Sequence, residues 1–270
     1  MYSIADYLYN GGLYLHNLFF PRRKKVSLLM IYSTTRCQSR CRHCSIWKKP
    51  DENLSLEDIK RIMSSRCVTR HTTVGLEGGE FILHPQAAEI MEWFSRYHPN
   101  YTLLSNGLAP ERVIEYVRKY LPKHLYLSLD GNRETYLRMR GRDGYDKVIR
   151  VVEGLKNEVP VSLMFCLSPW NDFEDMRFVI DVAKKYGIDV RVGIYGTIRS
   201  STRPVSCWRL MLRIILGEFP RIFTIRRKTM ISWRFMMSGG TGGFCCAARV
   251  YSVHWLSIRM VMCRFARISE

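Results

Sequence analysis

Six short apolar runs alternate with amphipathic stretches over the first two thirds of the chain, and this alternation limits the possible folds most. The runs at 28–32, 73–76, 101–104, 125–129, 161–167 and 189–194 have the length and residue types of strands. The stretches at 55–65, 85–97, 110–120, 145–157 and 173–186 have the spacing of helices. Strands separated by helices favour βαβ units and a parallel sheet.

Local signals at the helix ends support this division. Ser55, with Asp58 three residues later, predicts a capping box. Pro85 and Pro110 suit the first turns of their helices, and Gly187 suits a helix end. Right-handed crossovers would curl six βα units into a partial barrel. The predicted fold class is therefore α/β: a partial (β/α)6 TIM-like barrel with an N-terminal helix and an atypical C-terminal tail.

Three cysteines follow the first predicted strand: Cys37, Cys41 and Cys44, spaced C-x3-C-x2-C. Three thiolates on one short loop repel one another unless positive charge lies between them, so the spacing indicates a metal centre. A [4Fe–4S] cluster normally takes four thiolates. Three ligands would leave one iron open to a substrate or cofactor.

This motif, with Trp47 shortly after it, closely resembles the signature of the radical S-adenosylmethionine (SAM) superfamily. The resemblance extends over residues 26–195 and implies the same barrel fold. It implies that the open iron binds the amino and carboxylate groups of SAM. It further implies that one electron cleaves the C5′–S bond, and that the 5′-deoxyadenosyl radical abstracts a substrate hydrogen. The cofactor would carry the chemistry and the protein would orient it.

Two other interpretations of the cysteines remain open. A structural zinc ion prefers four ligands, and His43 is the available fourth donor, although it lies between two of the cysteines. The protein would then be a zinc-binding interaction module without catalysis. Disulfides require an oxidising compartment and would leave an odd thiol in this motif.

The segment Glu77-Gly78-Gly79-Glu80 follows the second predicted strand. Active-site residues of barrels gather at the carboxyl ends of the strands, and glycines let the backbone approach a ligand closely. The segment matches the family's Gly-Gly-Glu motif at Gly78, Gly79 and Glu80. The resemblance implies that these three residues contact the amino group of SAM.

The next two strands end in similar polar segments. Ser105-Asn106-Gly107 resembles the family's Thr-Asn-Gly turn, although an ordinary Asn-Gly turn remains an alternative. Ser128 and Asp130 share a face at the end of the fourth strand. The resemblance implies that Ser128, and Asn106 with it, position the nucleoside, and that Asp130 has a catalytic role.

Three arginines follow in close succession: Arg138, Arg140 and Arg142. A guanidinium group binds a carboxylate through two hydrogen bonds, so one of them is a candidate partner for the SAM carboxylate. The sequence does not choose among them, and we expect two to lie on the surface. Asn171 is a further, weaker candidate for the cavity.

The formal net charge of +18 is unevenly distributed. Residues 199–270 hold twelve Arg and one Lys against two Glu, a balance of +11, which leaves +7 for the rest. The basic excess therefore belongs mainly to the tail, and no nucleic-acid partner is expected. The predicted domains are an N-terminal helical segment at 1–25, a radical SAM core at 26–196 and the tail at 197–270.

The tail lacks the charge mixture of ordinary soluble surfaces. One explanation is translation in a shifted reading frame, which would make the chain an inactive product. A second is a cysteine-rich extension of the SPASM type, with an auxiliary cluster held by Cys207, Cys245, Cys246 and Cys263. A third is a basic arm, which the apolar content of the tail disfavours.

The N-terminal segment, rich in Tyr, Leu and Phe, ends in Pro21-Arg22-Arg23-Lys24-Lys25. We expect a helix packed on the domain, with contact to a membrane surface as the alternative. No run of about 18 apolar residues predicts a transmembrane helix, and no signal peptide is evident. Nine cysteines then favour the reducing cytoplasm. The family resemblance implies an external electron donor such as ferredoxin or flavodoxin. The expected substrate is a peptide, with a small molecule as the alternative.

Overall fold

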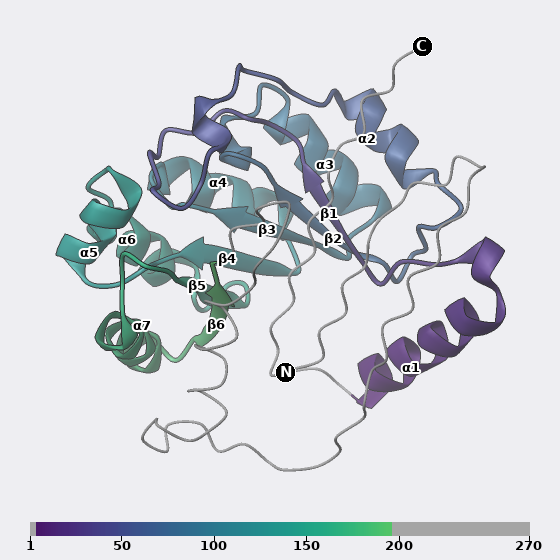
Figure 1. Cartoon of the computed structure of the whole chain (residues 1–270). Coiled ribbons are helices and arrows are strands. Elements are labelled where there is room, and N and C mark those ends of the chain that lie inside the picture. The colour runs from purple at the N-terminus through teal and green to yellow at the C-terminus, as the bar shows by residue number, and fades with distance from the viewer. Residues whose placement is uncertain (1–3, 196–270) are drawn as a thin grey trace, which may run out of the picture. The chain divides into compact units, whose positions relative to one another are not determined.

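The computed structural model describes residues 4–195, with side chains from residue 8 onward. Six parallel strands form one curled sheet in the order β1-β2-β3-β4-β5-β6 (Figure 1). Their bounds are β1 Leu28–Tyr32, β2 Thr73–Glu77, β3 Tyr101–Ser105, β4 His124–Ser128, β5 Val161–Leu167 and β6 Asp189–Ile194. The predicted partial (β/α)6 barrel is confirmed.

The α-helices that follow β1 connect the strands and form the outer layer of the half-barrel (Figure 1). The α-helices are α1 Ile4–Phe19, α2 Leu56–Met63, α3 Ala87–Tyr97, α4 Pro110–Tyr120, α5 Arg133–Arg140, α6 Tyr145–Leu155 and α7 Phe173–Tyr186. Short 3₁₀ turns are η1 Pro21–Arg23, η2 Ile46–Lys48 and η3 Phe81–Leu83.

The two faces of the sheet differ in burial, as β4 shows. Leu125 and Leu127 are completely buried against the helical layer, whereas His124, Tyr126 and Ser128 on the other face are half-buried. Successive side chains of a strand point to opposite faces, so Ser128 lies on the inner, concave face. Burial of each outer-face leucine contributes roughly 1.5–3 kcal/mol to folding.

Most of the predicted helix ends are confirmed. Ser55 and Asp58 form the capping box of α2, Pro110 is the first residue of α4, and Gly187 ends α7 in the left-handed conformation. The placement of Pro85 in a first turn is wrong, because α3 begins at Ala87 after the turn η3.

Helix α1 is attached to the barrel through one side. Leu13 is buried, the Tyr9 hydroxyl lies 3.3 Å from that of Thr69, and the Tyr9 ring lies 4.9 Å from the His71 ring. The Asn17 side chain bonds the backbone of Lys25. Within the described residues, no helix is long and apolar enough to cross a membrane.

The predictions for the tail, including the shifted frame and the auxiliary cluster at Cys207, Cys245, Cys246 and Cys263, lie outside the described residues.

Candidate active site

The cysteine loop follows β1 and is fixed by its own aromatic residue. The Trp47 indole N–H donates to the Cys41 carbonyl at 3.2 Å, and the Arg40 guanidinium lies 5.0 Å from the centre of the Trp47 ring. Two polar pairs hold the start of the loop, because the Thr34 hydroxyl donates to Asn53 and the Thr35 amide donates to the Glu52 carbonyl. The loop is thus positioned by its flanking residues.

Each of the three cysteine sulfurs accepts at least one N–H group. Cys37 Sγ lies 3.8 Å from the side-chain nitrogen of Asn106, Nδ2. Cys41 Sγ lies 3.9 Å from Arg140 Nη1, and Cys44 Sγ lies 3.5 Å from the backbone nitrogen of Ile46. Hydrogen bonds to cluster sulfurs are one of the means by which proteins set the reduction potential of an iron–sulfur centre.

The electrostatics of the cysteine loop favour the protonated thiol form of Cys37 and of Cys41. Burial raises the pKa of Cys37 to about 11, and the negative charges of Glu80 and the other two cysteines add to this effect. Burial also raises the pKa of Cys41, although the Arg140 guanidinium opposes it. Binding of a positively charged metal centre would replace the protons and relieve this repulsion.

The Gly-Gly-Glu segment is joined directly to the cysteine loop. The Gly79 amide donates to the Thr34 carbonyl and the Glu80 amide donates to the Arg36 carbonyl, both at 2.7 Å. Gly78 has a φ of 146°, which favours glycine, and a Cβ at Gly79 would overlap the Arg36 carbonyl oxygen. The close approach that these glycines permit is therefore made to the cysteine loop.

Glu80 connects this segment to the next polar turn. Its buried carboxylate accepts a hydrogen bond from the Ser105 hydroxyl at 2.9 Å and one from the backbone N–H of Asn106 at 2.7 Å. Burial raises the pKa of Glu80 to about 7 despite these hydrogen bonds. Asn106 itself points to the cysteine loop, where its side-chain nitrogen lies 3.3 Å from Ser39 Oγ.

Asp130 and Arg140 form a buried ion pair beside Cys41. Arg140 donates from Nε at 2.7 Å and from Nη2 at 2.6 Å to Asp130 Oδ2. The other carboxylate oxygen of Asp130 accepts from the Cys166 amide at 3.0 Å. Asn171, a weaker sequence candidate, donates to the backbone oxygens of Asp130 and Cys166. These contacts link β5, the end of β4 and the cysteine loop.

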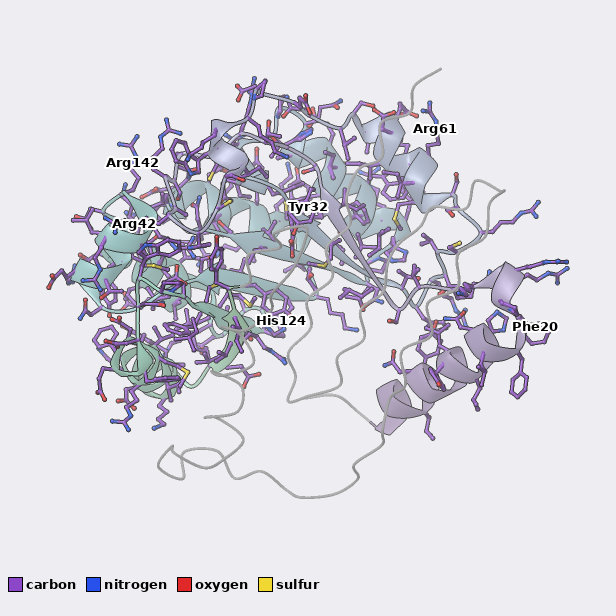
Figure 2. The ribbon with its side chains drawn as sticks, in the orientation of Figure 1. Phe20, Tyr32, Arg42, Arg61, His124 and Arg142 are labelled. Carbon is purple, nitrogen blue, oxygen red and sulfur yellow. The ribbon has the colours of Figure 1, made fainter. Side chains whose placement is uncertain are left out.

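The end of α5 also pairs with the cysteine loop through the backbone. The Arg40 amide donates to the Arg140 carbonyl and the Arg42 amide to the Met139 carbonyl, both at 2.9 Å. Arg142 donates from Nε to the Gln38 carbonyl at 3.2 Å. Figure 2 labels Arg42 and Arg142 on these two segments.

The structure distinguishes the three candidate arginines by burial. Arg140 is buried, whereas Arg138 and Arg142 are exposed, as expected for two of the three. Helix α5, which carries Arg140, was missing from the sequence prediction. Two signals for it were present: Asn132 accepts from the Thr135 amide as the N-cap, and Gly141 ends the helix with a φ of 63°.

The inner face of the sheet carries a carboxylate that the sequence prediction did not single out. Glu77 is paired in register with Tyr32 of β1, which is labelled in Figure 2, and Tyr32 donates a hydrogen bond to it. Burial raises the pKa of Glu77 to about 7. Ser128 is paired in register with Met164 of β5 on the same face.

The three free thiols of the cysteine loop suit the donor set of an iron–sulfur cluster. Among the described residues, no three Cys, His, Asp or Glu side chains are grouped so that they could hold one metal ion. A cube does not require such a group, since each thiolate binds a different iron. His43 is half-buried, with its ring edge-on to Tyr195 at 6.3 Å, and burial lowers its pKa.

Comparisons with known proteins identify the family of this chain. The family model described as "Radical SAM superfamily" matches residues 31–183. The antilisterial bacteriocin subtilosin biosynthesis protein AlbA of Bacillus subtilis is 30% identical over 116 residues, which are 41% of this chain and 26% of AlbA. The molybdenum cofactor biosynthesis protein moc-5 of Caenorhabditis elegans is 29% identical over 173 residues, 60% of this chain and 29% of moc-5. The chain thus covers less than a third of either relative.

Solved structures share the fold. Streptococcus suis SuiB with bound S-adenosylmethionine superimposes with a TM-score of 0.58 at 16% identity, over 81% of this chain and 54% of SuiB. SuiB has also been solved with its precursor peptide SuiA.

Proposed function

Because the chain belongs to the radical SAM superfamily, we propose that its residues 26–196 form a catalytic core that binds a [4Fe–4S] cluster and S-adenosylmethionine. Once bound and reduced, such a cluster would supply the electron for cleavage of the C5′–S bond of S-adenosylmethionine, and hydrogen abstraction from the substrate would follow. The main support is one observation: three thiols with N–H donors lie on a loop that is hydrogen-bonded to the Gly-Gly-Glu segment.

These contacts support the proposed residue roles. Cys37, Cys41 and Cys44 are the proposed cluster ligands. Gly78, Gly79 and Glu80 are the proposed contacts of the SAM amino group, because the backbone bonds hold this segment against the ligand loop. A carboxylate has about four acceptor positions. Glu80 therefore retains about one acceptor position for an ammonium group beside its bonds to Ser105, Asn106 and the Ile82 backbone.

Ser128 and Asn106 are proposed to position the nucleoside. The inner-face location of Ser128 supports its role, whereas the contacts of Asn106 support a second role toward Cys37. The catalytic role of Asp130 stays a prediction. Both of its oxygens are bonded in the structure, which supports a role in holding Arg140 beside Cys41.

We propose a peptide as the substrate and an external reductant of the ferredoxin or flavodoxin type. The proposal of a peptide is supported by the similarity to AlbA, which is named for bacteriocin biosynthesis, and by the peptide-bound structure of SuiB. The half-buried inner face offers Glu77, Tyr126 and Ser128 as polar contacts for such a substrate.

Anaerobic reconstitution with iron and sulfide tests the cluster assignment. The full chain is expected to bind about four irons and to turn brown. Replacing any one of Cys37, Cys41 and Cys44 by Ala should strongly reduce iron binding, whereas Cys67→Ala, outside the motif, should leave it unchanged. A colourless protein that takes up one zinc ion, or iron uptake insensitive to the three replacements, would refute the proposal.

A further inference from the structure

Helix α1 presents an apolar stripe to solvent. The stripe consists of Leu8, Leu15, Leu18 and Phe19, whose exposed fractions are 72, 52, 59 and 71%. At 3.6 residues per turn, these positions lie within one side of a helix. A helix of a globular protein normally turns its apolar side to the core, so the exposed stripe of α1 needs another explanation.

The opposite side of α1 makes the contacts with the barrel. Leu13 is buried there, and Tyr9 meets Thr69 and His71. The stripe is therefore left exposed by the way in which the helix is attached. Contiguous exposed apolar surface of this kind marks sites of interaction with proteins or membranes.

A basic segment directly follows the stripe. Arg22, Arg23 and Lys24 are exposed, Lys25 is half-buried, and the sequence has no Asp or Glu from residue 7 to residue 25. Phe20, labelled in Figure 2 at the end of α1, is 54% exposed. Aromatic and apolar side chains next to clustered Lys and Arg are the features of segments that bind anionic membrane surfaces.

The positive charge of residues 22–25 indicates which kind of partner binds the apolar stripe. A second copy of this chain docked through the same segment would offer no negative charge to residues 22–25, because its own residues 7–25 contain no Asp or Glu. An anionic lipid surface offers both an apolar layer and negative phosphates.

We propose that α1 lies in the plane of an anionic membrane surface, with the apolar stripe at the boundary of the acyl chains and residues 22–25 at the lipid phosphates. Binding is reversible and weakens with salt, since part of the attraction is screened. This inference is independent of the proposed catalytic function.

Vesicle co-sedimentation of the full chain tests the inference. The probes are vesicles of phosphatidylcholine alone and of phosphatidylcholine with phosphatidylglycerol, at low and high salt. The protein should sediment with the anionic vesicles at low salt, and much less with the neutral ones or at high salt. The double replacement Leu15→Glu and Phe19→Glu should lower the bound fraction at least tenfold, and neutralising Arg22, Arg23 and Lys24 should lower it similarly.

A matched control comes from another helix. Tyr97, at the end of α3, is 70% exposed, and Tyr97→Glu adds one negative charge away from the stripe, as a match for each of the single variants Leu15→Glu and Phe19→Glu. This variant should bind vesicles like the unmodified chain, and circular dichroism should show that all variants are folded. Absence of vesicle binding, or equal binding to neutral and anionic vesicles, would overturn the inference. So would light scattering that shows the stripe to mediate self-association instead.

Discussion

At the scale of single residues, the buried Asp130–Arg140 pair is the contact on which the candidate site most depends. Its two side chains are 0% and 8% exposed, and it connects the cysteine loop with the end of β4. Removing one partner of a buried pair leaves an uncompensated charge, which costs far more than losing both partners. Replacing one partner of this buried pair is therefore expected to lower stability far more than replacing one partner of a surface ion pair.

Arg140→Met is expected to destabilise the protein by about 3–5 kcal/mol, because it strands the Asp130 carboxylate in the interior. The double replacement with Asp130→Asn should recover much of this loss. Urea unfolding measures both, with Arg142→Met, at an exposed position, as the control. A single-variant loss no larger than the control's would show that the pair is not buried in solution.

Glu77 predicts a pH dependence of stability. Its pKa in the folded protein is about 7, above the ordinary value of 4.5, so the folded state holds the proton more tightly than the unfolded state does. The stabilisation from the protonated carboxyl group is complete below about pH 4.5 and is lost as the pH rises toward about 7. Glu77→Gln removes this loss.

Relative to the unmodified protein, the Glu77→Gln variant should therefore gain roughly 1–3 kcal/mol in unfolding free energy between pH 5 and pH 8. Chemical unfolding at the two pH values measures the gain. If the difference in unfolding free energy between the two proteins is the same at pH 5 and at pH 8, Glu77 is solvated in the folded protein.

At the scale of elements, two chain segments are built around the cysteine loop: the Gly-Gly-Glu turn after β2 and the end of α5. Both pair with the loop through two backbone hydrogen bonds. The first pairing requires glycine at position 79, because a side chain there would overlap the Arg36 carbonyl group.

Gly79→Ala should thus displace the cysteine loop and reduce the iron bound after reconstitution several-fold. Gly193→Ala is the matched control, because the nearest atom to a Cβ there is 3.8 Å away. Iron analysis and unfolding of both variants distinguish local from general damage. Equal iron content in the two variants would contradict the backbone pairing.

At the scale of the whole described unit, the barrel could be predicted from sequence because its strands and most helices have clear apolar periodicity. Helix α5 could not, since its outward positions are mostly charged and only Tyr136 and Met139 among its large apolar side chains are buried. The predicted helix start at Pro85 is wrong because the turn η3 comes first and α3 begins two residues later, at Ala87.

The candidate site was predictable in its residue types and less so in its contacts. The cysteine spacing and the Gly-Gly-Glu segment are local patterns. The pairing of Asp130 with Arg140, and of Asn106 with Cys37, depends on how separate βα units meet, which no local pattern specifies. The local pattern likewise does not specify that Gly78 and Gly79 approach the backbone of the cysteine loop.

These elements together are proposed to form a radical SAM active site. The most direct test of this claim is the release of 5′-deoxyadenosine from S-adenosylmethionine by the reconstituted full chain with dithionite under anaerobic conditions. We predict release that depends on protein, reductant and each of the three motif cysteines. A cluster-loaded protein that releases no more 5′-deoxyadenosine than a protein-free control would contradict the claim.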